Sequence, residues 1–191
     1  MEFNKSVSNP MLVGCIELLK AEDTPEHRNM FVAELLKASL LAPALINPAP
    51  EEDEEGSLKL IPGSKIQFPM LLTPDGKQYY MGFTDEVEYQ LWVEKNHPCP
   101  TFAMAFDDYI GMMTRKDSDG NVIPTDGIVI NPYGADLVMP KDMLAQIMAN
   151  RMIQLLRQKD KKAVQKLRVP GSSTIVAPET SSAAREDLEE K

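Results

Sequence analysis

The chain has 191 residues, 43% of them hydrophobic and 26% charged, and its 29 acidic and 20 basic side chains give a net charge of -9. A chain of this length can bury enough surface in one core to fold without metal ions or disulfide bonds. Cys15 and Cys99 are too few for a disulfide framework. The longest apolar stretches, such as 38–46, fall well short of the ~20 residues that a membrane helix needs. The composition therefore predicts one soluble cytoplasmic domain with no transmembrane segment.

The net charge is unevenly distributed along the chain. Residues 1–150 hold 11 basic and 23 acidic side chains, a net charge of -12, whereas residues 151–169 hold 7 and 1, a net charge of +6. Residues 170–191 hold 2 and 5, a net charge of -3, and are rich in Ser, Thr, Pro and Glu. We therefore expect a folded domain over 1–150, a basic extension of the last helix over 151–169 and a disordered acidic tail over 170–191.

Helix-start signals and prolines organise the first part of the chain. Asn9-Pro10 predicts a helix to about Lys20, and Thr24-Pro25 predicts a second helix that continues until Pro43. A short buried strand is expected over 44–46. The five consecutive acids of 51–55, approached by two prolines, predict an unstructured loop.

Alternating apolar residues over 66–72 predict a half-buried strand, with Pro69 at an edge or a bulge. The turn sequence of 73–77 and the strand pattern of 78–83 complete a hairpin. Thr84 is expected to cap a helix whose inward face carries Val87, Leu91 and Trp92.

The remaining predicted elements are short strands, one short helix and turns, and they follow one another closely until the long last helix. We predict a strand over 101–105, a helix over 106–113, a polar link, a buried strand over 127–130, a tight turn over 131–134 and a strand over 136–139. Pro140 is expected to begin the longest helix. Tight turns between strands, without regular strand–helix alternation, favour a single α+β domain with a mixed or antiparallel sheet packed by helices, followed by the long C-terminal helix and the disordered tail.

The order of these motifs resembles the N-terminal domain of the SseB family, the enhanced serine sensitivity proteins of bacteria. The resemblance covers roughly residues 11–150. It rests on the Phe83-Thr84-Asp85 opening with Trp92 downstream, and on the Ile-Asn-Pro-Tyr-Gly turn that ends at Gly134. The family has no established catalytic residues to transfer, so the resemblance implies a fold and leaves activity open.

Candidate catalytic and metal-binding groups are sparse. His97-Pro98-Cys99 lacks two ligands of a structural zinc site, and Cys15 with His27 would have to converge on it from the other end of the domain. The acidic pairs at 85–86 and 107–108 point in different directions on their helices and are better explained by helix dipoles. We therefore predict no cofactor and no metal site, and we lean against an enzyme.

The turn Asn131-Pro132-Tyr133-Gly134 is the strongest cluster of special residues. Asn can bond nearby backbone, Pro fixes φ and Gly permits a sharp turn, so we interpret it as a requirement of the fold. A small-molecule pocket or small enzyme site built from this turn and the 107–108 pair is the alternative hypothesis. The 12 methionines, many of them in the second half, are interpreted as core filling, although exposed ones beside the basic helix would indicate an interaction groove.

The basic segment supplies the principal functional hypothesis, a non-catalytic protein-interaction or adaptor module. Its candidate residues are Arg151, Arg157, Lys161 and Lys162, which follow the apolar row of the last helix. An acidic protein partner, or the acidic 51–55 loop of the same chain, would complement them. Nucleic acid is an unfavoured partner because the acidic body repels phosphates, and anionic lipid is disfavoured for the same reason. Homo-oligomerisation is left open.

Overall fold

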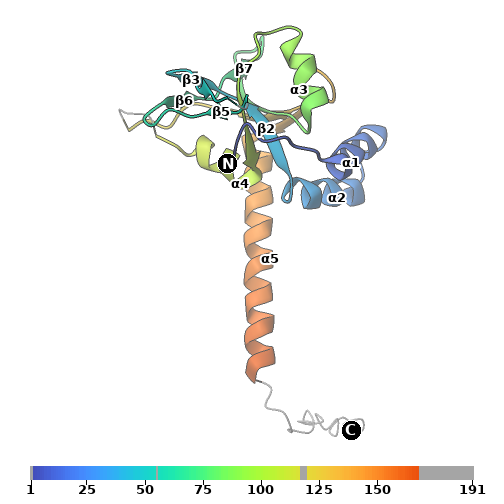
Figure 1. Cartoon of the computed structure of the whole chain (residues 1–191). Coiled ribbons are helices and arrows are strands. Elements are labelled where there is room, and N and C mark those ends of the chain that lie inside the picture. Colours follow the sequence, from blue (N-terminus) through green and yellow to red (C-terminus); the bar gives the residue numbers. More distant parts are fainter. Residues whose placement is uncertain (1, 55, 117–119, 168–191) are drawn as a thin grey trace, which may run out of the picture. The chain divides into compact units, whose positions relative to one another are not determined.

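The computed structural model describes residues 2–54, 56–116 and 120–167, with side chains described as far as 159 in the last range. The chain divides into two compact units, Met1–Asn150 and Arg151–Lys191. The expected disordered tail of 170–191 lies outside the described residues. The first unit combines helices with mixed and antiparallel sheets, which confirms the predicted α+β class (Figure 1).

The first sheet is built around β9 (Thr101–Ala105). This strand pairs antiparallel with β1 (Glu2–Phe3) on one side and with β2 (Ser39–Pro43) on the other. Four of the five residues in each of β2 and β9 are buried, which is why both sequences are nearly continuous apolar runs.

The second sheet is mixed and has the order β11-β10-β8-β7. β7 (Met70–Leu72) and β8 (Gln78–Gly82) form the predicted hairpin, β10 (Gly127–Ile130) runs parallel to β8, and β11 (Leu137–Pro140) is antiparallel to β10. An isolated bridge joins the two sheets. The Leu41 amide donates to the Phe83 carbonyl at 2.8 Å, and the Phe83 amide donates to the Leu41 carbonyl at 2.9 Å.

Two small ribbons extend from the sheets, and one corrects an expectation. β3 (Leu45–Asn47) pairs with β6 (Lys65–Gln67), and β4 (Glu51–Glu52) pairs with β5 (Leu58–Lys59). The start of the acidic 51–55 stretch is thus a strand rather than an unstructured loop. The Asp53 carboxylate stabilises this ribbon, because it accepts a hydrogen bond from the Ser57 amide at 2.8 Å and forms an ion pair with the Lys59 ammonium at 3.0 Å.

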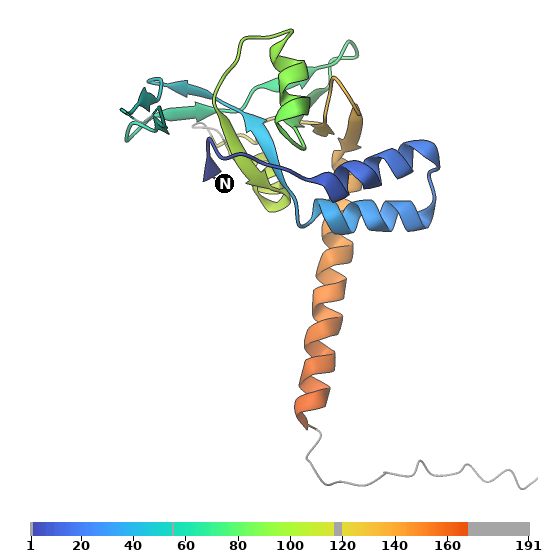
Figure 2. The ribbon, with the colours of Figure 1, turned by 45° about the vertical axis from the view of Figure 1, so that its right-hand side comes forward.

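The helices α1 (Pro10–Ala21) and α2 (Pro25–Leu35) form a hairpin that packs along its length (Figure 2). The prediction that α2 continues to Pro43 is wrong. The chain leaves the helix after Leu35, because the residues from Ser39 onward pair with β9 and with the Phe83 bridge. Long-range strand pairing here overrides a local helical pattern.

The three later helices are α3 (Glu86–Val93), α4 (Phe106–Met113) and α5 (Lys141–Leu167). Asp85, not Thr84, is the N-cap of α3, and Val87 is 74% exposed while Tyr89 and Trp92 point inward. Pro140 ends β11 rather than beginning α5. Among the described residues, no helix combines the length and apolar character needed to cross a membrane.

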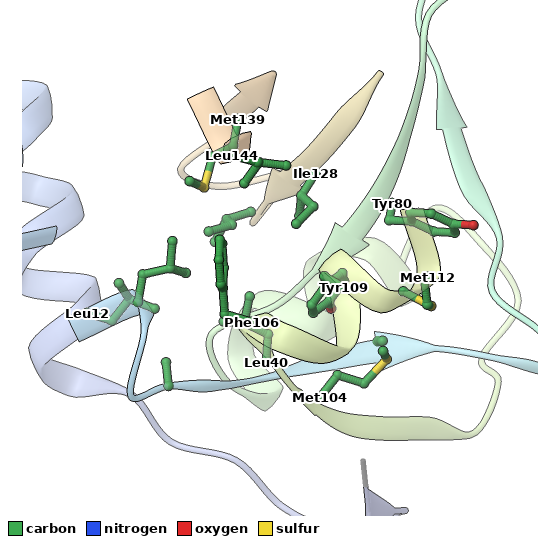
Figure 3. Packing of buried hydrophobic residues seen from close by; sticks show 14 of the residues in the cluster. Leu12, Leu40, Tyr80, Met104, Phe106, Tyr109, Met112, Ile128, Met139 and Leu144 are labelled. Atoms are coloured by element: carbon green, nitrogen blue, oxygen red, sulfur yellow. The ribbon is translucent and has the colours of Figure 1, made fainter. Parts of the chain in front are cut away.

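Buried residues fill the first unit in two clusters. Leu12, Tyr109, Ile128, Met139 and Leu144 belong to the larger cluster, where helix and strand side chains interdigitate (Figure 3). The smaller cluster contains the predicted core residue Trp92, whose ring lies 5.7 Å from Tyr89 and 6.3 Å from Phe83 between centroids. The contact with Phe83, which directly follows β8, packs α3 against the end of the second sheet.

Candidate functional site

The turn between β10 and β11 is held by the buried side chain of Asn131. This residue adopts a φ of 51°, is only 2% exposed and lies directly after Ile130. Its Oδ1 accepts from the Thr84 amide, and its Nδ2 donates to the Thr84 hydroxyl, both at 2.9 Å. Asn131 therefore uses its side-chain amide to join the end of β10 to the segment that enters α3.

The network continues from Thr84 into neighbouring elements. The Thr84 hydroxyl donates to Asp85 Oδ2 at 3.1 Å, while Asp85 Oδ1 accepts from the Glu88 amide at 3.0 Å and caps α3. Asn9, before α1, donates from Nδ2 to the carbonyls of Thr84 and Ser39 at 2.8 and 2.7 Å. These polar groups serve to connect α1, α3 and both sheets.

Glu88 is a residue of this site that sequence reasoning missed. Its carboxylate lies against Gly134, where a Cβ would clash with both carboxylate oxygens, and its Oε2 is buried without a hydrogen-bond partner. Burial, reinforced by the neighbouring Asp85 carboxylate, raises the pKa of Glu88, and Lys20 opposes the shift. Gly134 thus leaves room for the Glu88 carboxylate in its present position, and it does so without a positive φ.

The other predicted residues of the turn lie nearer the surface. Pro132 and Tyr133 are half-buried, and the ammonium of Lys95 lies 4.8 Å from the centre of the Tyr133 ring. The acidic pair at 107–108 begins α4, where Asp108 accepts from the Ala105 amide at 3.0 Å. Asp108 borders a hollow of about 360 Å³ beside Lys5, Ser6 and Asn9, and residues 131–134 do not line that hollow.

The cysteine and histidine candidates are dispersed. Cys15 is buried in the core, and the Cys99 carbonyl accepts from the Tyr89 hydroxyl at 2.6 Å. Burial raises the pKa of both thiols, which disfavours thiolate chemistry at neutral pH. Burial also raises the pKa of Tyr89, to about 12. Within the part of the chain that the structure describes, no group of three or more His, Cys, Asp or Glu side chains is placed to hold a metal ion.

The segment of α5 beyond Asn150 combines exposed apolar side chains with basic ones. Met152, Leu155 and Leu156 are 57%, 46% and 52% exposed, and at 100° per residue they form one row that also includes Lys159. Arg151 is half-buried and Arg157 is exposed. Lys161 and Lys162 lie in α5, but their side chains are outside the described part.

A second apolar surface, which sequence reasoning missed, lies along α1. Two adjoining hollows of about 540 and 480 Å³ share Pro10, Gly14 and Glu17. The methionine and leucine side chains at 11, 18 and 30 are exposed here. The spacing of Met11, Gly14 and Leu18 on one helix face was the available signal, because it places large apolar side chains on both sides of a glycine.

Comparison with known proteins identifies one family. The model described as "SseB protein N-terminal domain" matches residues 12–146. This range includes the Asn131 turn, the first residues of α5 and every strand of the two sheets other than β1. No curated protein and no solved structure matches the chain.

Proposed function

Since the chain belongs to the SseB family, we propose that it is a non-catalytic protein-interaction module that binds its partner through the basic apolar segment of α5. The residues concerned are Met152, Leu155, Leu156 and Lys159, called the α5 row below. The free cysteines, neither of them in a disulfide, support a reducing cytoplasmic location as part of the same proposal.

The exposure of the α5 row is the observation that carries the proposal. Placing a leucine in water forfeits roughly 1.5–3 kcal/mol relative to burying it, so adjacent exposed leucines are a cost that binding would recover. Large side chains of this kind, grouped with basic residues, are the composition of a helix that docks in a groove.

Charge indicates the chemistry of the partner. The segment 151–169 carries a net charge of +6, so an acidic protein surface with an apolar floor would attract it and accept the leucines. The acidic 51–54 stretch of the chain itself is a weaker candidate, because Asp53 already pairs with Lys59.

The proposal is tested by capturing binding proteins with the full-length chain and comparing two double variants. Leu155→Glu with Leu156→Glu places charge in the α5 row. Asn150→Glu with Gln154→Glu introduces the same charge on the opposite face, since positions 150 and 154 are exposed and lie roughly 150–170° from the middle of the row.

We expect the first variant to lose partners that the second retains, with both folded as judged by circular dichroism. Equal capture by both variants would show that the apolar row is not the binding surface. Equal loss would assign binding to net charge alone, which contradicts the docking of a specific face.

A further inference from the structure

We infer that the apolar groove along α1 receives the α5 row of a second copy of this chain, so that copies associate head to tail. This inference rests on the proposed function, because it takes the α5 row as an interaction segment. It adds the receiving surface, which lies on a different part of the molecule.

The groove has the apolar lining expected of a surface that binds a helix. It follows the exposed face of α1, and it is bordered by Met11 and Leu18 on α1, Met30 on α2 and Val87 on α3, all of them exposed. Methionine side chains adapt to irregular partner surfaces. The α1–α2 hairpin that carries three of these residues is visible in Figure 2.

Gly14 lines both hollows and lies inside a helix. A Cβ at this position would meet nothing within 4 Å, so no contact within the chain requires glycine here. Glycine in a helix interior is nevertheless destabilising relative to alanine. Close approach of another backbone explains why this position lacks a side chain.

The charges of the two surfaces are complementary. Glu17 borders both hollows, and Asp85 and Glu86 border the larger one, whereas neither hollow is lined by lysine or arginine among the described residues. The α5 row places Lys159 beside its leucines, and the segment 151–169 that contains the row carries a net charge of +6. The same chain therefore carries both an acidic apolar groove and a basic apolar helix, and this pairing identifies a second copy as the occupant.

The test measures association of full-length protein by sedimentation equilibrium across a wide range of concentrations. Gly14→Gln blocks the groove, and Leu155→Glu with Leu156→Glu blocks the helix. Each should weaken self-association by about tenfold or more. Because a head-to-tail contact needs one intact groove and one intact helix, an equimolar mixture of the two variants should form heterodimers with the affinity of the original contact.

Gly111→Gln is the matched control, since Gly111 is another helical glycine with open space around it; it is exposed on α4, outside the groove. It should leave association unchanged. Gly14→Ala separates the effect on stability from the effect on association. Alanine should raise Tm by roughly 2–4 °C, because it favours the helix, while its side chain weakens association.

Three results would overturn the inference: unmodified protein that is monomeric at every concentration, variant mixtures that stay monomeric, or a Gly111→Gln variant impaired as much as Gly14→Gln. If they occur while Leu155→Glu with Leu156→Glu still abolishes capture of another protein, the proposed function stands and the self-docking inference alone is wrong.

Discussion

Two stretches of α5 use the same kinds of side chain in opposite ways. In the first unit, Leu144 is fully buried and Ile147 nearly so, and both pack in the larger core cluster. In the second, Leu155 and Leu156 are about half exposed. A continuous apolar row in a sequence therefore does not by itself mark core, because the first residues of this row are buried and the later ones are exposed.

The largest expected effect tests whether burial separates the two stretches. Leu144→Ala should lower the free energy of unfolding by about 2–5 kcal/mol, because it leaves a cavity in the core. Leu155→Ala should change it by less than about 0.5 kcal/mol, as exposed positions do. Urea denaturation of both variants measures the difference. Similar losses in the two variants would mean that Leu155 is part of the folded core.

The second prediction extends the comparison to buried polar groups. Asn131→Ala should cost about 2–4 kcal/mol, because the Thr84 amide loses its buried acceptor and alanine strains a positive φ. Asp136→Ala is the control, since Asp136 also has a positive φ, of 49°, but is exposed. The Asp136→Ala variant should lose only the free energy that comes from placing alanine at a positive φ. Equal losses of stability in the two variants, measured by thermal unfolding, would mean that the Asn131–Thr84 hydrogen bonds do not stabilise the fold.

The smallest expected effect concerns the carboxylate beside Gly134. Because the pKa of Glu88 is raised in the folded state, its ionised form opposes folding, and the contribution of this group to stability falls as pH rises through the carboxyl range. Glu88→Gln should therefore raise Tm at pH 7 by no more than about 2–4 °C and have less effect near pH 3.

Glu94→Gln, at the exposed C-terminal end of α3, removes the same charge as a control. Thermal melts over the acid range compare the two variants with the unmodified chain. A Glu88→Gln advantage that grows toward low pH would reverse the assigned sign and contradict a pKa of Glu88 that is raised by burial.

Local signals were enough for the central part of the fold. The strand at 101–105, the helix at 106–113 and the strand at 127–130 coincide with β9, α4 and β10, because each is bounded by a turn or a change of hydrophobic period. The error at α2 arose where a helical pattern and a buried strand overlap in sequence. Pairing with β9, 58–66 residues further along the chain, decides that Ser39–Pro43 is extended.

The site was less predictable than the fold for a similar reason. The special residues of 131–134 are evident in the sequence, but their partners at Thr84 and Glu88 lie 46 or 47 positions away. The groove on α1 likewise requires Met30 and Val87 to approach from other helices. Spacing within one element indicates a face, whereas a surface formed by several elements depends on tertiary packing.

The central claim, that the α5 row binds a protein, is tested most directly by site-specific photo-crosslinking of the full-length chain. A photoreactive side chain at position 156 should form a defined protein adduct, while the same group at position 154, on the opposite face, should not. Adducts that are absent at 156, or equally abundant at both positions, would contradict the account.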